Sequence, residues 1–449
     1  MWKGDIMLVN ISARQIYETG ACTAIKDAAF PAPFVSGLEY NSPARGTWNI
    51  VHVGMLIPKS HQIYICAANC LRGVVLTAAE MGTLDRFSTI TVQENNVLEG
   101  DMEELIIEGV SDILEKLPQK PPAVLVFTAC IHHFMGCDLE LVYNELRKRY
   151  PEVDFAECYM NPIMRKSGLT PDQIMKRQMY SLLEPLELNK KSINIIGNNI
   201  STDESSELVR TIRESGYELK DITFCKTYDE YLKMAESIVN ISYLPIAIPG
   251  GDYLYEKLGQ KHLHLPLCYG FDEITENLNI LNEYLGLPQK EYEEEKSAAL
   301  KALEEAKEVI GDVKISIDYT AVPRPAGLAR LLVENGFNVD RLYVDSFTEW
   351  DRKDFDWLVK NKPEMKVYAT AHAKMRVLDR KCCEKSLAIG QKAAYFTESE
   401  YFVNIVEGGG MYGFDGIVRL TGHMKEAFIC PKNIQDHIKM KGLGCDCLL

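Results

Sequence analysis

Short apolar runs alternate with amphipathic stretches through the second half of the chain. Residues 192–197 (SINIIG) form an apolar run that ends in glycine, and the periodic stretch 204–215 after it is also followed by glycine. Polar residues before a periodic segment and glycine behind it mark the start and end of a helix. Apolar runs at 222–225 and 241–248 flank another helical stretch at 229–238. This alternation predicts a parallel α/β domain.

The same pattern begins again after residue 310. The run 313–318 (VKISID) is followed by a helical stretch at 326–335 and by two further apolar runs, 341–344 and 366–370. The segment 290–310 before them is rich in Glu, Lys and Ala, which are good helix formers. We therefore expect a second domain of similar build, joined to the first by a solvated connecting helix.

The first part of the chain also has α/β character, because the buried-strand run 123–127 (AVLVF) lies between helical stretches at 101–117 and 139–150. A chain of 449 residues is too long for one hydrophobic core, since cores stop growing at about 250–300 residues. The sequence predicts three doubly wound parallel-sheet domains: 1–191, 192–310 with the connecting helix, and 311–449 with the C-terminal tail.

The composition narrows the function. The chain has 49 basic and 64 acidic residues, a net charge of −15, and this argues against nucleic acid as a partner. No run approaches the about 20 apolar residues of a membrane span, and the N-terminal sequence MWKGDIMLVN does not resemble a signal peptide. We expect a cytoplasmic protein whose 13 cysteines are reduced and serve metal binding, catalysis or core packing.

Several cysteines lie where a metal site could form. Cys130 follows the strand 123–127, and ligands of open α/β sheets gather at the carboxyl ends of strands. Cys66 and Cys70 form CAANC, which would place both thiols on one face if the segment is helical. Zinc would need a second such pair, whereas iron–sulfur clusters take about four thiolates from separate segments. Cys22, Cys66 or Cys70, and Cys130 could supply three; the alternative is that they are buried packing residues.

Other motifs give weaker evidence about the function. The adjacent His132 and His133 could tune or ligate a metal, or could be ordinary loop histidines. The chain has no GxxxxGK[ST] and no GxGxxG after a predicted strand, so we expect no P-loop ATP hydrolysis and no dinucleotide fingerprint. The run 408–410 (GGG) either lines a cavity or turns the chain.

Five features in this order resemble the nitrogenase component 1 (molybdenum-iron protein-like) superfamily: Cys22, the Cys66/Cys70 pair, residues 94–101 (ENNVLEGD), TACIHHFMGCD with Cys130, and MYGFDG at 411–416. The resemblance implies three α/β domains, with cysteines of the first holding an iron–sulfur cluster between two subunits. By residue, it implies Cys22 as the first ligand, Cys66 as the second with Cys70 as its rival, and Cys130 as the third. The cluster would be [4Fe-4S] or a larger, P-cluster-like one.

The resemblance also implies a function. It points to an oxidoreductase subunit that relays electrons from an ATP-dependent iron-protein reductase to a small-molecule substrate, as a homodimer or beside a homologous chain. Dinitrogen-reducing members hold a second metal cofactor with a Cys, which would fall near 243–244, and with a His before GFDG; both are absent here. Cys225, Cys268 or Cys383 could hold a different second cofactor, but no motif supports this. The alternatives are a scaffold for metal-cluster assembly and a plain α/β binding protein.

Overall fold

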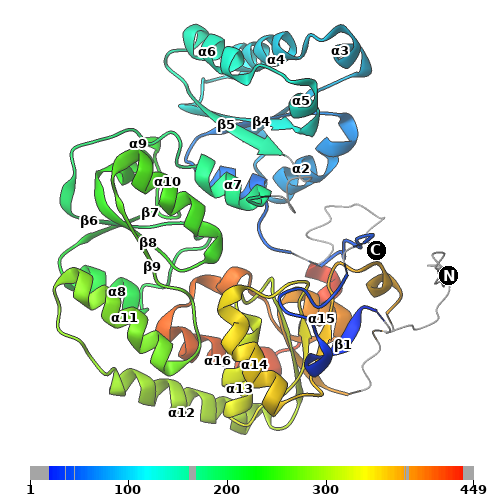
Figure 1. Ribbon diagram of the computed structural model, residues 1–449, viewed down its shortest axis with the longest axis vertical. Coiled ribbons are helices and arrows are strands. Elements are labelled where there is room, and N and C mark those ends of the chain that lie inside the picture. Colours follow the sequence, from blue (N-terminus) through cyan, green and yellow to red (C-terminus); the bar gives the residue numbers. More distant parts are fainter. Residues whose placement is uncertain are drawn as a thin grey trace. The chain divides into compact units, whose positions relative to one another are not determined.

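The computed structural model describes residues 20–35, 37–44, 46–160, 168–378, 380 and 384–437. The chain divides into two compact units. The two-sheet unit comprises residues 48–201 and 209–266, and the one-sheet unit comprises the described parts of 1–47, 202–208 and 267–449 (Figure 1).

The first sheet of the two-sheet unit has four parallel strands in the order β3-β2-β4-β5. The strands are β2 (His61–Cys66), β3 (Phe87–Thr91), β4 (Ala123–Ala129) and β5 (Asp154–Met160). The helices around it are α1 (Ile50–Met55), α2 (Ala68–Glu80), α3 (Glu94–Glu99), α4 (Met102–Lys116), α5 (Cys130–Met135), α6 (Leu139–Arg149) and α7 (Pro171–Gln178).

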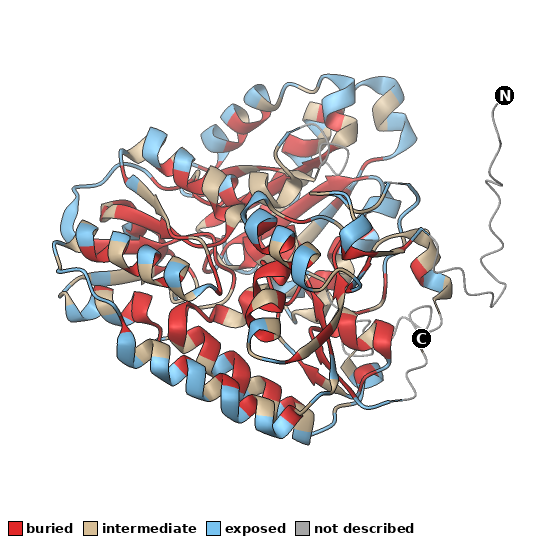
Figure 2. Cartoon of the chain, turned by 60° about the horizontal axis from the view of Figure 1, so that its bottom comes forward, coloured by how far each residue is buried: buried red, intermediate tan, exposed pale blue. Residues whose placement is uncertain are grey.

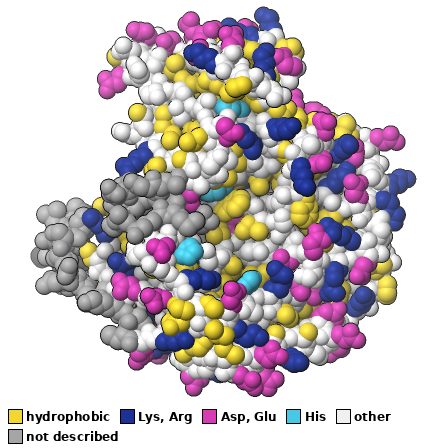
Figure 3. Space-filling view, turned by 180° about the vertical axis from the view of Figure 1, so that it is seen from behind, with side chains coloured by type: hydrophobic (Ala, Val, Ile, Leu, Met, Phe, Trp, Pro, Cys, Tyr) yellow, Lys and Arg dark blue, Asp and Glu magenta, His cyan; other side chains and the backbone are white. Residues whose placement is uncertain are grey.

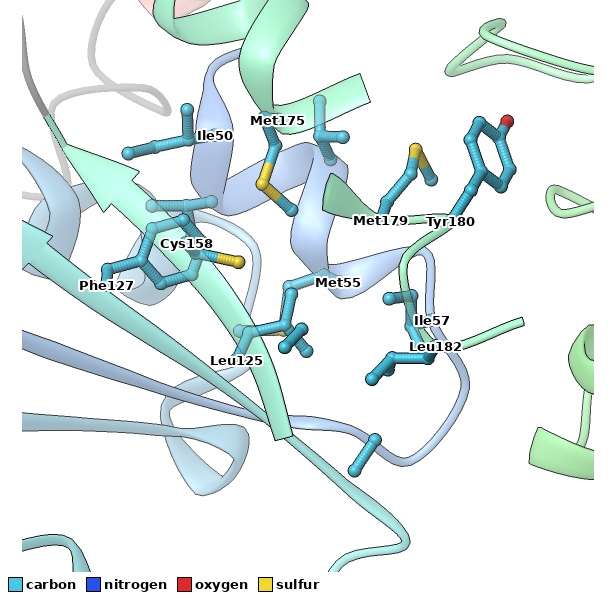
Figure 4. Packing of buried hydrophobic residues seen from close by; sticks show 14 of the residues in the cluster. Ile50, Met55, Ile57, Leu125, Phe127, Cys158, Met175, Met179, Tyr180 and Leu182 are labelled. Carbon is cyan, nitrogen blue, oxygen red and sulfur yellow. The ribbon is translucent and has the colours of Figure 1, made fainter. Parts of the chain in front are cut away.

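Strands β2 and β4 are buried along their whole length because helices cover both faces of this sheet. Alternate residues point to opposite faces. Tyr64 and Phe127 stack on one face with ring centroids 4.2 Å apart, in a cluster that includes residues of α1, α2 and α7. Figure 4 shows Phe127 in this cluster with Ile50 of α1 and Met175 of α7. Ile63 and Val126 lie on the other face, with residues of α4 and α6.

The second sheet of this unit is also parallel, in the order β7-β6-β8-β9. Its elements are β6 (Asn189–Ile195), α8 (Glu207–Glu214), β7 (Glu218–Asp221), α9 (Tyr228–Leu232), β8 (Ser237–Ser242), α10 (Ile248–Leu258) and β9 (Lys261–His264). The apolar cluster that holds Phe127 continues through Tyr180 to Tyr231 and Leu254, so both sheets share one core. This shared core explains why the two sheets form one compact unit.

The one-sheet unit is built on a sheet of six strands in the order β1-β12-β11-β10-β13-β14. Its strands are β1 (Cys22–Ala24), β10 (Lys314–Asp318), β11 (Asn338–Tyr343), β12 (Lys366–Tyr368), β13 (Ser386–Ile389) and β14 (Tyr401–Val403). Its helices are α11 (Phe271–Leu285), α12 (Glu293–Ile310), α13 (Pro325–Glu334), α14 (Arg352–Asn361), α15 (Gln391–Thr397) and α16 (Gly413–Ile429).

The predicted α/β class with three doubly wound parallel sheets is confirmed, and only β1, which is antiparallel to β12, departs from the pattern. In all three sheets the strands are mostly buried and the outer faces of the helices are exposed (Figure 2). The predicted connecting helix is α12. It was expected to be solvated, but one of its faces is buried: Ala299, Leu303 and Ala306 are inaccessible to solvent. The domain boundaries expected at residues 191 and 310 stay a prediction, while the described residues between 20 and 47 group with the third sheet.

Charges of both signs are interspersed over the described residues of the face drawn in Figure 3, as the composition leads one to expect of a protein without a basic footprint. In the described part of the chain, every helix is too short or too polar to cross a membrane.

Candidate functional site

The carboxyl ends of β2 and β4 meet at the middle of the first sheet. Strand β2 leads through α2 to β3 on one side, whereas β4 leads to β5 on the other side. The strand order therefore reverses between β2 and β4, and open α/β sheets bind ligands outside the carboxyl ends of strands at such a point. Cys66 is the last residue of β2, and Cys130 comes directly after β4.

Cys66 is paired in the sheet and does not belong to the helix that follows it. Its neighbour across the ladder is Thr91 of β3, and helix α2 begins only at Ala68. Cys70 lies in the first turn of that helix and is exposed. The condition under which both thiols would share one helix face is therefore not met, because strand pairing extends as far as Cys66.

The thiols of Cys70 and Cys130 lie close enough to affect that of Cys66. Burial is the largest of the effects that together raise the pKa of Cys66 to about 12, and the nearby thiols of Cys70 and Cys130 contribute to the rise. Cys130 is half-buried, with its Sγ 4.0 Å from the carbonyl oxygen of Met160. A metal that binds a thiol displaces its proton, so metal binding at Cys66 would have to overcome the raised pKa of this thiol.

The two histidines beside Cys130 differ in their surroundings. His132 is buried, and its Nδ1 accepts a hydrogen bond of 3.1 Å from the backbone N–H of Ala129, which precedes α5. Burial lowers the pKa of His132. His133 is exposed and its ring contacts Phe134. His132 thus has a structural role in starting α5, which sequence reasoning did not foresee.

Cys22 belongs to the one-sheet unit, whereas Cys66, Cys70 and Cys130 belong to the two-sheet unit. It pairs with Tyr368 at the start of β1 and lies near Tyr343. Among the described residues, no three His, Cys, Asp or Glu side chains surround a point where one metal ion would bind. Cysteines of a cluster ligate separate iron atoms, so such a group is not required of them. The assignment of Cys22, Cys66 and Cys130 as ligands, with Cys70 as a rival, stays a prediction.

Exposed apolar side chains accompany these thiols, and the sequence pattern did not single them out. Phe134 and Met135 of α5 are 68% and 45% exposed, and Leu98 of α3 is 82% exposed. Helices α2, α3 and α5 lie on the side of the sheet toward which β4 and β5 point (Figure 1). Large apolar groups left in water around a binding edge are typical of a surface that a partner covers.

The other cysteines considered for a second cofactor have ordinary neighbours. Cys225 donates toward the carbonyl oxygen of Asp221 over 3.4 Å, and buried Cys268 accepts from the side-chain amide of Asn277 over 3.4 Å. Burial raises the pKa of both thiols to about 12. Cys383 lies outside the described residues.

The glycine run 408–410 turns the chain ahead of α16, with all three residues at positive φ. Helix α16 then begins at Gly413. The buried carboxylate of Glu207 accepts a hydrogen bond from the backbone N–H of Asp415, with 3.1 Å between oxygen and nitrogen. A side chain at position 413 would reach within 2.2 Å of this carboxylate. The segment GFDG is thus the capped start of a helix. The glycine run before it fits both interpretations, because it turns the chain and its Gly408 also lines a small cavity with Leu267 and Met411.

Comparison with known proteins identifies the family. Residues 55–428 match the family model described as nitrogenase component 1 type oxidoreductase. Two solved structures of nitrogenase Cp1 share the fold. The structure at pH 6.5 has a TM-score of 0.65 and 15% sequence identity, and the match covers 88% of this chain and 94% of that chain. The structure at pH 5 has a TM-score of 0.57 and 14% identity, and the match covers 94% of this chain and 95% of that chain. No curated protein sequence matches the chain. Because the family model spans most of its length, the chain belongs to the nitrogenase component 1 type oxidoreductase family.

Proposed function

We propose that this chain is an iron–sulfur oxidoreductase subunit that relays electrons from an ATP-dependent iron-protein reductase to a small-molecule substrate. Membership of an oxidoreductase family supports the reaction class. The observation that carries the proposal is the meeting of Cys66 and Cys130 at the carboxyl ends of adjacent parallel strands, with Cys70 beside them. The acidic, thiol-rich composition supports a reducing, cytoplasmic location.

Cys22, Cys66 and Cys130 would hold the cluster, with Cys70 as the alternative to Cys66. When bound, the cluster supplies one-electron storage and transfer. Cys66 must lose its thiol proton to act as a ligand of the cluster, and burial opposes this ionisation in the free protein. Cluster loading therefore releases protons and becomes weaker as the pH falls.

Two sequence features argue against standard dinitrogen reduction. Positions 243 and 244, where dinitrogen-reducing members would carry a cofactor cysteine, are Tyr243 and Leu244, and both are buried. The stretch 401–412 ahead of GFDG contains no histidine. We infer that the substrate is a different small molecule that is hard to reduce.

The surface around the thiols supports an oligomer. Cys70 is exposed beside a helix whose Phe134 and Met135 also face water. A second copy or a homologous chain that covers this surface would bury these apolar groups and could add the remaining cluster ligands.

Substitution of the thiols under anaerobic conditions tests the ligand assignment. Cys130→Ala should lose most of the iron and the thiolate-to-iron absorption of the reconstituted protein. Cys158→Ala is the matched control, because Cys158 is buried on the neighbouring strand β5 opposite Phe127 and away from the strand end. Full iron content in Cys130→Ala would refute the assignment. Cys66→Ala and Cys70→Ala then decide which of the pair is the ligand.

A second experiment separates an enzyme from a cluster-assembly scaffold. The loaded protein is mixed with an iron-protein reductase and ATP, and electron consumption is followed with candidate substrates. Sustained consumption supports the oxidoreductase. Transfer of the cluster to an apo-acceptor without such consumption would replace the proposal with the scaffold.

A further inference from the structure

The loop after β6 is held by a carboxyl group that lies inside the two-sheet unit. Asp221 is the last residue of β7 and is 1% exposed. Its Oδ2 accepts a hydrogen bond of 2.7 Å from the side-chain amide of Asn198, and its Oδ1 accepts from the backbone N–H and the hydroxyl of Thr223 over 2.8 Å each. The Thr223 hydroxyl in turn accepts from that of Ser201 over 3.0 Å. Asp221 therefore ties both ends of the segment 198–201 to the end of β7.

The segment 198–201 is also where the chain leaves this unit. Residues up to 201 belong to the two-sheet unit, residues 202–208 belong to the one-sheet unit, and the chain returns within α8. Gly197 fixes the start of the segment, because its N–H donates to the hydroxyl of Tyr180 over 3.1 Å. The bonds to Asp221 thus decide how firmly the chain is held between Gly197 and the point where it leaves the two-sheet unit.

Other titratable groups face Asp221 from the neighbouring elements. Helix α7 contributes Lys176, which is inaccessible to solvent and donates to the side-chain oxygen of Asn199 in the same loop. The thiol of Cys225 donates to the backbone carbonyl oxygen of Asp221 and does not contact its carboxyl group. Burial raises the pKa of Cys225 and of Tyr180, so both are uncharged at neutral pH. The charge that faces the Asp221 carboxyl group is therefore that of Lys176.

The balance of these effects brings the ionisation of Asp221 close to neutral pH. Burial is the largest effect and raises the pKa of Asp221 to about 6, whereas the hydrogen bonds from Asn198 and Thr223 and the charge of Lys176 lower it. An aspartate in water has a pKa of about 3.9. The protonated form can also donate a hydrogen bond, and Oδ1 of Asn198, on the amide that contacts Asp221, is buried and has no partner among the described residues.

We propose that the carboxyl group of Asp221, with Asn198, Thr223 and Ser201, forms a pH-sensitive latch that holds the segment 198–201 more firmly when it is protonated. When the segment opens, water reaches the carboxyl group and its pKa returns toward the ordinary value. The closed latch then binds the proton more tightly than the open one, so protonation favours the closed state. This stabilisation is complete below about pH 3.9 and is lost as the pH rises through about 6. The latch is independent of the proposed function, because it includes no cluster ligand.

Amide hydrogen exchange of the metal-free full chain measures the opening of the latch, because exchange from a folded protein reports local opening. The reporters are the N–H groups of Gly197 and Thr223, followed by mass spectrometry of peptides that cover 196–201 and 222–225. Each rate is divided by the intrinsic exchange rate at the same pH. The resulting opening constant should fall about 10-fold from pH 7 to pH 5, because the pKa of Asp221 is about 6 when closed and about 3.9 when open.

Two carboxylate variants assign the effect to its source. Asp221→Asn cannot ionise, so its opening constant should be the same at pH 7 and at pH 5. Asp203→Asn is the matched control: Asp203 follows the same segment, burial raises its pKa, and it pairs with Arg419 over 2.6 Å. This control should keep the 10-fold change. A change that persists in Asp221→Asn, or that is lost in Asp203→Asn, would overturn the proposal.

The variant Thr223→Val decides if Asp221→Asn does not fold. It removes the hydroxyl donor that favours the ionised carboxylate, so the midpoint of the pH dependence should move above pH 6. A midpoint that stays at pH 6 would overturn the latch. An unaltered protein whose opening constant is the same at pH 7 and pH 5 would overturn it as well.

Discussion

A buried arginine in the one-sheet unit allows a quantitative prediction. Arg324 is 4% exposed, and its Nη2 donates to Asp354 over 2.9 Å and to the carbonyl oxygen of Trp350 over 2.7 Å. Its Nη1 donates to Glu273 over 3.3 Å and to the carbonyl oxygen of Leu267 over 3.4 Å. Removal of one partner of a buried ion pair costs about 3–5 kcal/mol, because the other charge stays buried without compensation.

We expect Arg324→Met to lower the free energy of unfolding of this unit by about 3 kcal/mol, the lower end of that range. The lower end applies because Arg330 still donates to Asp354 over 3.2 Å. Arg330→Met is the matched control: it removes a half-buried partner of the same carboxylate and should cost about 1 kcal/mol or less.

The loss in Arg324→Met should also depend on pH. Burial raises the pKa of Asp354, and Arg324 opposes this rise. Without the arginine the carboxyl group protonates more readily, and the protonated form needs no counter-ion. The deficit should therefore be largest at neutral pH and shrink as the pH falls toward 4.

Urea unfolding followed by tryptophan fluorescence measures this loss. Trp350 and Trp357 both lie in the one-sheet unit, so a background in which Trp2 and Trp48 are replaced by phenylalanine reports on that unit. An equal loss in Arg324→Met and Arg330→Met would refute the charge argument. A loss that does not change with pH would assign the effect to packing of the side chain instead.

Two further predictions concern the two-sheet unit. Gly197 has a φ of +82°, and a Cβ there would lie 2.0 Å from Cβ of Ala247; Gly197→Ala should cost about 3 kcal/mol from left-handed strain and overlap together. Gly216→Ala, at φ +73° with open space around it, should cost only about 1 kcal/mol. Both losses are measured by urea unfolding in a background that keeps Trp48, which lies in the two-sheet unit, and replaces the other three tryptophans by phenylalanine. Burial lowers the pKa of His61, whose Nε2 lies 2.8 Å from the Ser88 hydroxyl, to about 4. The unfolded chain protonates first, near pH 6.5, so stability should fall by about 3 kcal/mol as the pH drops from about 6.5 to 4, and His61→Gln should flatten that dependence in denaturation curves.

The alternation of apolar runs with amphipathic stretches was sufficient to predict most of the strands and helices of the fold. The predicted strand 123–127 is β4 (Ala123–Ala129), and the predicted helix 326–335 is α13 (Pro325–Glu334). Strand β7 (Glu218–Asp221) lies four residues before the apolar run predicted for it. The sequence ELKD is polar because β7 is an edge strand with little to bury, and an apolar search passes over such a strand.

The prediction of a strand at 241–248 was wrong in its bounds for a different reason. Strand β8 ends at Ser242, and the apolar residues after it lead through Pro245 into α10 (Ile248–Leu258). An apolar run shows that residues are buried but does not show where a buried strand gives way to a buried helix. This misplaced boundary also hid Ser242 as the end of a strand, where its hydroxyl lies 2.8 Å from both His262 and His264.

At the candidate site, the sequence pattern was also insufficient to show which strands are neighbours in the sheet. Cys66 and Cys130 could each be assigned to a strand end from the local pattern, but β2 and β4 are neighbours only because β3 lies on the far side of β2. Cys22 forms strand β1 by pairing with β12, more than 340 residues away in sequence. Its three-residue strand is specified by its partner, so its own sequence contained too little information to reveal it.

The candidate cysteines depend on a general property of parallel sheets. Strands that run in one direction bring their carboxyl ends to one edge, so residues far apart in sequence meet there without any local motif. The cysteines of the first sheet and the Ser242–His264 pair of the second sheet both occupy such an edge. Because β2 pairs with β4, Cys66 lies beside Cys130 although 63 residues separate them, so this pair follows from the strand order and not from the spacing of cysteines along the chain.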